Sequence, residues 1–221
     1  MLENIITVVE RYWSLFLSGL GYTLLLALIT VVCGTLLGSL IALMRMARFR
    51  PLSVVATAFI EVIRGTPLLL QLYVFYFLVP KIMPFEIGEF TSVSMALVIN
   101  STAYVAEIIR AGILAVDRGQ TEAARSLGMD SRQTMVRIVM PQAVKNILPA
   151  LCNELIVLLK ETSISGYIAL QDLTKAGDIV RSRTYSPFFP YISVALMYLA
   201  LVLVLEKLLN HMEGRLARSD R

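Results

Sequence analysis

The 221-residue chain is too apolar for an ordinary soluble domain, since 57% of its residues are hydrophobic and its mean hydropathy is +0.73. Its net charge of +4 comes from basic residues beside apolar segments, a pattern that orientation in a membrane explains better than nucleic-acid binding does. A single histidine, cysteines within apolar runs (Cys33 and Cys152) and the lack of a Gly-x-x-x-x-Gly-Lys-Ser/Thr motif argue against a metal site, a disulfide and an ATP site in this chain.

The expected fold class is an all-α polytopic membrane protein, formed by a single transmembrane domain over residues 1–221. A helix needs about 20 mostly apolar residues to cross the hydrocarbon core of a bilayer. Five transmembrane helices are predicted, at about 18–43, 52–80, 90–113, 144–164 and 191–209.

The first predicted span lies in a long uncharged run, from Tyr12 to Met44. This run is longer than a bilayer requires, so its front part is expected at the interface, with Tyr12 and Trp13 at the level of the headgroups. Gly34 and Gly38 form a Gly-x-x-x-Gly pair, a spacing that allows two helices to approach closely.

The second predicted span is interrupted near its middle. Pro67 lacks a backbone N–H and Gly65 stands just before it, a combination that breaks or bends a helix. Glu61 and Arg64 are three residues apart and can pair on one helix face. The pattern leaves two interpretations open, a self-neutralising ion pair and a polar lining for a transport pathway.

The third predicted span has polar residues at its centre, among them Asn100. Polar groups at membrane depth are costly and usually face protein or water. Asn100 is therefore interpreted either as a hydrogen-bonding residue between helices or as part of a substrate site.

A polar stretch separates the third span from the fourth. Asp117 and Gln120 have the spacing of a capping box, and Gly128 is the residue type expected just past a helix end. These residues predict a short helix at about 118–127, which is far too short to cross a membrane.

A second helix is expected at 132–140, capped by Ser131 and broken by Pro141. The fourth span that follows is the least apolar of the five. It contains Glu154, which has apolar neighbours and no opposite charge three or four residues away. A carboxylate within the membrane is a functional hypothesis by default. The alternatives are an ion pair with Arg64 and a hydrogen bond between helices.

The positions of lysine and arginine predict an N-terminus outside and a C-terminus in the cytoplasm. Five spans place the loop after the first span, the central polar stretch and the C-terminal tail on one side, with thirteen of the 20 basic residues. The last outer loop is the exception, because it carries four basic residues. A short interfacial helix is expected in it, near 170–173.

The central polar stretch contains a recognisable motif: Glu122-Ala123-Ala124, three residues, Gly128, nine residues, Ile138, one residue, Met140-Pro141. It resembles the signature loop of the permease subunits of binding-protein-dependent ABC importers, in which a leucine stands at the position of Met140. Four further segments are similar to the polar amino acid branch of these permeases, which carries histidine, glutamine, glutamate or arginine. They are Glu61–Leu69 (EVIRGTPLL), Ala103–Gly112 (AYVAEIIRAG), Asn146–Ala150 (NILPA) and Lys160–Ser163 (KETS).

The resemblance implies a type I ABC importer permease fold and a cytoplasmic coupling helix that docks on a separate ATPase subunit. The residues expected to couple to the ATPase are Glu122, Ala123, Ala124, Arg125, Leu127 and Gly128. The alanines would form a small face for a groove, Leu127 an apolar anchor, and the charged pair would set the register.

The resemblance further implies two ATPase subunits that bind ATP and Mg²⁺, a second permease subunit (identical or paralogous) and an extracytoplasmic amino acid-binding protein. The chain is expected to lie in the plasma or inner membrane of a prokaryote and to contain no catalytic residue, metal or cofactor. Glu154 is the first substrate-binding candidate, followed by Glu61 and Asn100, and an acid in the pathway favours a cationic amino acid. The alternatives are an ATP-independent secondary transporter or channel, which only the spans themselves favour, and an intramembrane enzyme, for which a convincing catalytic set is missing.

Overall fold

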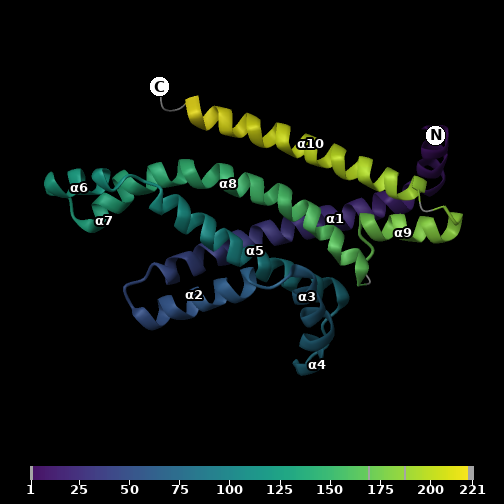
Figure 1. Ribbon diagram of the computed structural model, residues 1–221, viewed down its shortest axis with the longest axis horizontal. Coiled ribbons are helices and arrows are strands. Elements are labelled where there is room, and N and C mark those ends of the chain that lie inside the picture. The colour runs from purple at the N-terminus through teal and green to yellow at the C-terminus, as the bar shows by residue number, and fades with distance from the viewer. Residues whose placement is uncertain (1, 169, 187, 219–221) are drawn as a thin grey trace.

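The structure, a computed structural model, describes residues 2–168, 170–186 and 188–218. Helices and connecting turns make up this described part, which contains no strand and confirms the predicted all-α class. The molecule is elongated. Helices α1 (Leu2–Arg45), α5 (Glu89–Leu114) and α10 (Phe188–Arg218) run in one direction, and α2 (Arg50–Arg64) and α8 (Met140–Glu161) run in the other (Figure 1).

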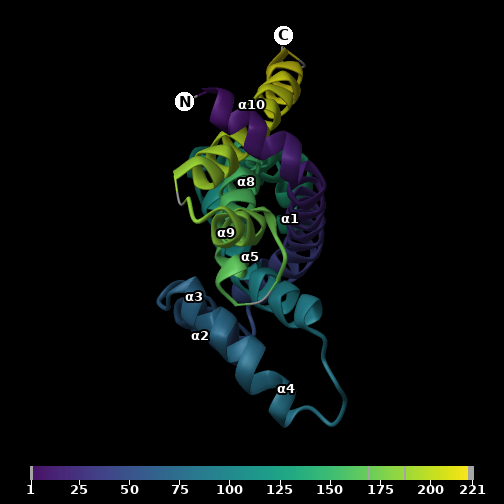
Figure 2. The same cartoon turned by 90° about the vertical axis from the view of Figure 1, so that its right-hand side faces the viewer.

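Helix α1 is kinked near its beginning. Tyr12 has φ −118° and ψ 18°, outside the helical range, and the segment before it turns across the end of the molecule (Figure 2). The kink therefore falls at the residue that the sequence places at the membrane interface. The remainder of α1 is an apolar helix whose main contact is with α5.

The second apolar segment is divided as expected at Gly65–Pro67. Its parts are α2, α3 (Leu68–Tyr73), a π-helical turn η1 (Val74–Leu78) and α4 (Val79–Ile82). Pro67 adopts φ −64° and ψ 136°, so the helical hydrogen-bond ladder stops before it. The two halves are bent by 103°, so the predicted interruption of the span 52–80 is a sharp bend between two helical segments.

Helix α5 forms the centre of the bundle. In its most apolar stretch 67% of the residues are buried, against 28% in α1 and 17% in α10. Glycines allow neighbouring helices to come close to it. A Cβ at Gly38 of α1 would lie 2.7 Å from Val105 of α5, and one at Gly34 would collide with Ser101. The predicted close approach at the Gly-x-x-x-Gly pair is confirmed.

Between α5 and α8 lie α6 (Arg118–Ser126), α7 (Ser131–Thr134) and a single π-helical turn, η2 (Met135–Val139). The prediction that Ser131 caps the second helix is wrong, because Asp130 caps it. The Asp130 side chain accepts the N–H of Gln133 at 2.8 Å, and the Gln133 side chain accepts the N–H of Asp130 at 3.1 Å. This reciprocal pair is a capping box.

The prediction that Pro141 breaks this helix is also wrong. Met140 donates its N–H to the carbonyl oxygen of Met135, five residues back. A π turn just before the proline shifts the hydrogen-bond register, so the missing N–H interrupts no α-helical ladder at that point. As a result α7, η2 and α8 form one continuous helix.

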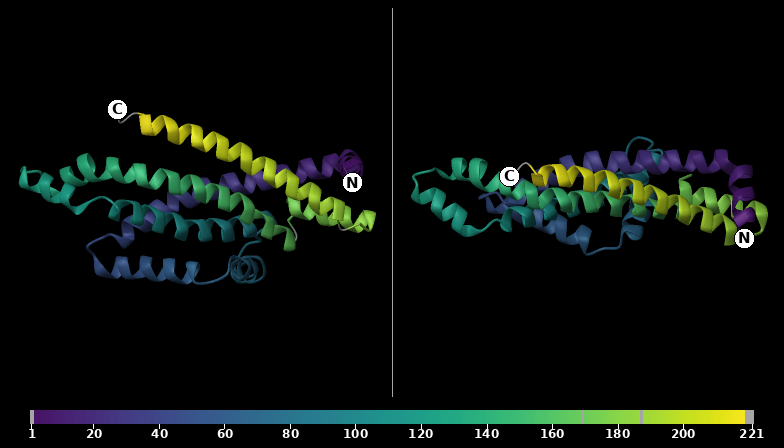
Figure 3. Two further views of the ribbon diagram at one scale, coloured as in Figure 1. Left: turned by 45° about the horizontal axis from the view of Figure 1, so that its top comes forward. Right: turned by 90° about the horizontal axis from the view of Figure 1, so that it is seen from above.

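After α8 the chain forms a 3₁₀ turn, η3 (Thr162–Tyr167), and then α9 (Leu173–Thr184). The short helix expected near 170–173 is therefore longer and begins three residues later. Helix α9 lies at the end of the molecule where α1 begins, and α6 and α7 lie at the opposite end (Figure 3).

Three described helices are long and apolar enough to cross a membrane: Ile5–Arg45, Glu89–Leu114 and Phe188–Leu209. The bent pair Arg50–Arg64 and Leu68–Ile82 would count as a fourth. Helix α8 has 22 residues, a sufficient length, but its polar side chains keep it out of this set. Five spans and an outside N-terminus remain predictions.

Candidate functional site

Helix α6 begins at an aspartate cap. The Asp117 side chain accepts the N–H of Gly119 at 2.7 Å, which satisfies one of the free amide groups at the helix start. The expected capping box with Gln120 is not formed, because the Gln120 side chain instead accepts a long hydrogen bond of 3.5 Å from Gln142.

Helix α6 ends in a glycine turn, as its sequence predicts. Gly128 has φ +87°, a conformation that glycine adopts without steric cost. Its N–H donates to Arg125 O at 3.0 Å, and the N–H of Met129 donates to Ala124 O at 3.1 Å. These two bonds are the Schellman pattern, and they turn the chain sharply toward α7.

The surface of α6 differs from the expectation at one position. Ala124 is only 4% exposed within this chain, so it packs inward, and the prediction that both alanines fill a partner's groove is wrong for it. Glu122 and Ala123 are exposed, and Leu127 is 85% exposed. The Arg125 guanidinium donates to Met129 O at 2.8 Å, so it also braces the turn.

Glu154 is half-buried on α8. It borders a cavity of about 10 Å³ between α1, α5 and α8, which has room for about one water molecule and not for an amino acid. Within the described residues Glu154 forms no ion pair, so the alternative of a direct pair with Arg64 is not realised.

Asn100 is 4% exposed and forms a hydrogen bond between helices, one of the two roles left open for it. Its amide donates to Gln71 Oε1 at 3.0 Å, and Gln71 Nε2 donates to Ile63 O at 2.7 Å and to Thr66 O at 3.1 Å. These bonds fix the break between α2 and α3 against α5. Sequence reasoning missed Gln71; an amide four residues after Pro67 in an apolar run was the available signal.

The expected ion pair between Glu61 and Arg64 is not formed. Arg64 instead extends toward α5, where its Nη1 lies 3.8 Å from Glu107 Oε2 and its guanidinium lies 5.3 Å from the centre of the Tyr104 ring. Glu61 is exposed and has no hydrogen-bond or ion-pair partner in the described part of the chain.

Glu107 is the centre of an arginine cluster that sequence reasoning did not assemble. Arg110, one turn along α5, donates to it at 2.5 Å and 3.2 Å, and Arg45 at the end of α1 donates to it as well. A pocket of about 450 Å³ opens beside this cluster, between α1, α2 and α5. It is lined by Arg45, Ile60, Glu61, Arg64, Gly65, Tyr104 and Glu107.

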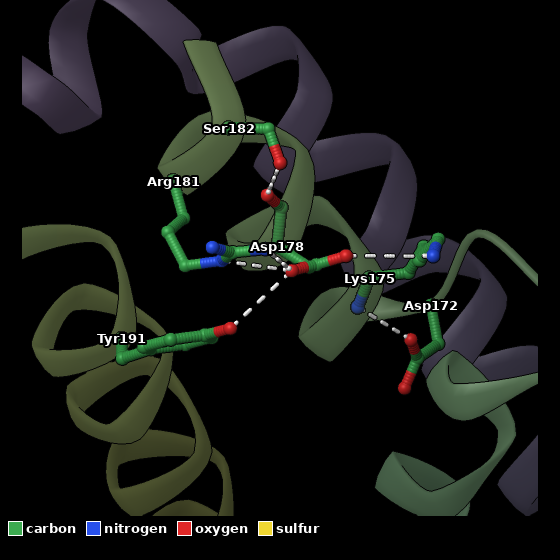
Figure 4. Close-up of polar contacts among 6 residues, drawn as sticks. All are labelled: Asp172, Lys175, Asp178, Arg181, Ser182 and Tyr191. Atoms are coloured by element: carbon green, nitrogen blue, oxygen red, sulfur yellow. Dashed lines mark hydrogen bonds and ion pairs between the residues drawn. The ribbon is translucent and has the colours of Figure 1, made fainter. Parts of the chain in front are cut away.

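A second polar cluster joins α9 to its neighbours at the opposite end of the molecule (Figure 4). Asp178 accepts hydrogen bonds from Arg181 at 2.8 Å and 3.0 Å and from Tyr191 of α10 at 3.3 Å. The Arg181 hydrogen bonds, together with Lys175, lower the pKa of Asp178. This cluster holds α9 against α10.

Taken together, apolar helices in alternating direction, ionisable side chains within the bundle and a protruding capped helix at one end are the features of a multi-pass membrane protein. Residues 34–218 match the family described as binding-protein-dependent transport system inner membrane component, and the chain belongs to this family.

Curated relatives match over almost their full length. The arginine transport system permease protein ArtQ of Bacillus subtilis (strain 168) is 41% identical over 204 residues, covering 92% of this chain and 93% of that protein. The probable glutamine ABC transporter permease protein GlnM of the same organism is 42% identical over 207 residues, covering 94% and 95%.

Solved structures agree in fold. A crystal structure of an amino acid ABC transporter with histidines has a TM-score of 0.89 and 51% sequence identity, covering 94% of this chain and 96% of that chain. The inward-facing MetNI methionine ABC transporter has a TM-score of 0.68 at 18% identity, covering 98% and 99%, and this likeness concerns the fold alone.

This chain is therefore a permease of an amino acid ABC transporter and a multi-pass protein of the inner membrane. Its family consists of permease subunits, and the ATPase site belongs to a separate subunit.

Proposed function

We propose that this chain forms the translocation pathway of an ATP-driven importer for a polar amino acid and that α6 couples the pathway to a separate ATPase subunit. The observation that carries the coupling role is the exposed apolar end of α6. Leu127 is 85% exposed at the end of the molecule rich in arginine, outside the apolar helices. An exposed leucine on a short, doubly capped helix is suited to fill a pocket on another protein.

The proposed complex contains two permease subunits, identical or paralogous, two ATPase subunits that hold ATP and Mg²⁺, and an extracytoplasmic amino acid-binding protein. It lies in the plasma membrane of a prokaryote, which agrees with the bacterial relatives. Glu122 and Ala123 of α6 and Leu127 just after it are exposed and are proposed to touch the ATPase. Ala124, Arg125 and Gly128 keep the helix and its turn in position.

ATP-driven closure of the ATPase pair would move α6, and a short turn joins α6 to the continuous helix from α7 to α8, which carries Glu154. Two arrangements of the bundle, one open to each side, are then favoured differently by ATP and by the loaded binding protein. No bond chemistry takes place in this chain.

For the substrate, Glu154 remains the first proposed contact, with Glu61 and Asn100 behind it. A carboxylate in the pathway suits a cationic group, and one relative is named for arginine transport. Other relatives are named for glutamine or cystine transport, so the shared property is a polar amino acid. Asn100 is the weakest candidate, because its amide is already engaged by Gln71.

The coupling role is tested with Leu127→Asp. Because Leu127 is almost fully exposed, the substitution leaves the fold intact, and it places a charge in an apolar contact. We expect the affinity for the ATPase subunit to fall about thirtyfold or more, the loss typical of an interface hot spot, and ATP-driven uptake to fall with it. Co-purification of the ATPase and uptake of radiolabelled amino acid into vesicles measure the two effects.

Tyr185→Asp is the matched control, since Tyr185 is 93% exposed at the opposite end of the molecule and aspartate tolerates its φ of 53°. It is expected to leave ATPase binding unchanged. Normal co-purification and uptake for Leu127→Asp would contradict the coupling role. Uptake that needs no ATP would favour the alternative, a secondary transporter or channel.

A further inference from the structure

The pocket between α1, α2 and α5 has features of a ligand site that the proposed coupling role does not use. Its volume of about 450 Å³ lies in the range typical of small-molecule sites, about 300 to 1,000 Å³. Its lining combines arginines, glutamates and an aromatic ring. The cavity beside Glu154, at about 10 Å³, is too small for such a ligand in this conformation.

The charges immediately around Glu107 are not balanced among themselves. Three arginines face Glu107, and two of them, Arg45 and Arg110, donate hydrogen bonds to it. The third, Arg64, is 3.8 Å away, beyond hydrogen-bond distance. The excess of positive charge over Glu107 would be reduced by an anionic ligand.

Arg64 is positioned to bind such a ligand. Its guanidinium lies 5.3 Å from the centre of the Tyr104 ring, which orients it, and its side chain is 41% exposed. Among the described residues it donates no hydrogen bond. A guanidinium with free N–H groups binds a carboxylate through two parallel hydrogen bonds.

Glu61 supplies the opposite charge. It lies one turn before Arg64 on α2, so both side chains lie on the same side of the helix, and both line the pocket. Glu61 is exposed and, within the described chain, unpaired. The last turn of α2 adds partial negative charge from its carbonyl groups. Together they suit a cationic ammonium group.

A carboxylate and an ammonium group on one small molecule are the head of an α-amino acid. We propose that this pocket binds the zwitterionic head shared by α-amino acids, with the carboxylate on Arg64 and the ammonium on Glu61. Arg45 and Glu107 are the other charged residues that line the pocket. This proposal rests on the proposed function and adds the part of the substrate that is recognised and the residues that recognise it.

The position of the pocket distinguishes it from the cavity at Glu154. On α5 the two are neighbours, because Ser101 and Val105 line the cavity and Tyr104 and Glu107 line this pocket. On α1 they are apart, because the cavity is lined by Val31 and Thr35 and the pocket by Arg45 at the end of the helix, ten residues or about 15 Å beyond Thr35 at 1.5 Å per residue. In the predicted orientation the pocket lies on the cytoplasmic side of Glu154.

The test uses the permease–ATPase complex in lipid nanodiscs without nucleotide. Binding of tritiated L-arginine and L-glutamine is measured at equilibrium. Two analogues compete with L-arginine: agmatine, which lacks the carboxylate, and desamino-arginine, which lacks the ammonium group. The wild-type complex is expected to prefer L-arginine to both.

For Arg64→Gln we expect binding of L-arginine and L-glutamine to weaken about tenfold or more, as for loss of a charged hydrogen bond, and the preference over agmatine to disappear. Arg64→Lys keeps the positive charge and should therefore retain part of the binding and part of the preference over agmatine. For Glu61→Gln the preference over desamino-arginine should disappear instead. Glu86→Gln, which changes an exposed glutamate outside the pocket, is the control and should behave as the wild type.

Unchanged analogue preferences in Arg64→Gln and Glu61→Gln would overturn the proposal, and so would preferences that are lost in Glu154→Gln alone. These selective changes also separate recognition from structural damage, which would weaken all ligands equally. If the wild-type complex neither binds nor transports any amino acid, the proposed function itself fails. Transport by the wild type with normal preferences in both pocket variants defeats only the pocket assignment.

Discussion

Asp172 shows how a single buried side chain can connect two helices. It is fully buried and caps α9, where its Oδ1 accepts the N–H of Lys175 at 2.8 Å. The next residue, Leu173, donates its N–H to the Thr23 hydroxyl of α1 at 3.1 Å. Asp172 also lies directly against Gly19, where a Cβ would be 2.7 Å from its carbonyl oxygen. In the described structure its Oδ2 has no hydrogen-bond partner.

Burial raises the pKa of Asp172 from 3.8 to about 6, although the backbone N–H of Lys175 acts in the opposite direction. The folded state therefore holds a proton that the unfolded state releases between these two values. The stabilisation is complete below about pH 4 and is lost as the pH rises through about 6.

The variant Asp172→Asn should remove this pH dependence. Asparagine keeps an oxygen for the Lys175 N–H but carries no charge, so at pH 7 the variant should be more stable than the wild type by up to about 3 kcal/mol. Thermal unfolding in nanodiscs between pH 4 and pH 7.5 measures the difference. Asp130→Asn, at an exposed helix cap, should keep the wild-type profile. Parallel profiles for Asp172→Asn and the wild type would contradict the assignment.

At the scale of helices, α1 and α5 approach each other through glycines. Gly38 packs where a Cβ would be 2.7 Å from Val105, whereas a Cβ at Gly21 would meet nothing within 4 Å. The two positions lie on the same helix and differ only in what they face. Alanine substitutions at the two positions therefore separate the effect of the contact between helices from the effect of helix propensity.

Gly38→Ala and Gly21→Ala should change stability in opposite directions. The first should destabilise by about 1 to 3 kcal/mol, because α1 and α5 must separate or distort. The second should stabilise by up to about 1 kcal/mol, because alanine is the better helix former. Thermal unfolding of both variants under one condition gives the comparison. A stabilising Gly38→Ala would show that the two helices do not pack as described.

The helices that could be predicted were those with strong local signals. The glycine turn at Gly128 and the break at Pro67 each follow from backbone properties of one residue, and both are found. The continuation of the helix through Pro141 could not be predicted, because it depends on a π turn that no residue type indicates in the sequence. The 103° bend after α2 depends on packing of Gln71 and Asn100 against the break.

The candidate sites follow the same division. The protruding α6 could be predicted from its caps, but the burial of Ala124 depends on how α6 packs against its neighbours α7 and η2, which no local sequence pattern specifies. Arg64 was paired with Glu61 by helix spacing, and its contact with Glu107 requires that α2 and α5 lie side by side. Arg45 and Glu107 are 62 residues apart, a separation at which sequence spacing carries no information.

At the scale of the whole molecule, α6 and α9 lie at opposite ends (Figure 1). If the helices between them cross a bilayer, the two ends face different compartments. The four basic residues of the last outer loop are the exception to the charge rule in the sequence. Arg181 and Lys175 now have a structural role there, since both contact Asp178.

Cysteine labelling tests this arrangement. In a background with Cys33→Ser and Cys152→Ser, Ser126→Cys on α6 should react with a membrane-impermeant maleimide only after the cytoplasmic face is opened. Ser182→Cys on α9 should react in intact cells, because Ser182 is exposed at the opposite end. Labelling of both positions from the same side would refute the five-span, N-outside topology.

The unbroken passage from α7 through η2 into α8 has a mechanical consequence. From Ser131 to Glu161 the chain is a rod of about 45 Å at 1.5 Å per residue, and the link from α6 to its near end is a short turn braced by Arg125. Because the helix has no interruption between its two ends, a displacement of one end is expected to tilt the whole helix. If the proposed ATPase contact at Leu127 moves the near end of this helix, Glu154 is expected to move with it, and α5, which α8 contacts, is the neighbour along which α8 would shift.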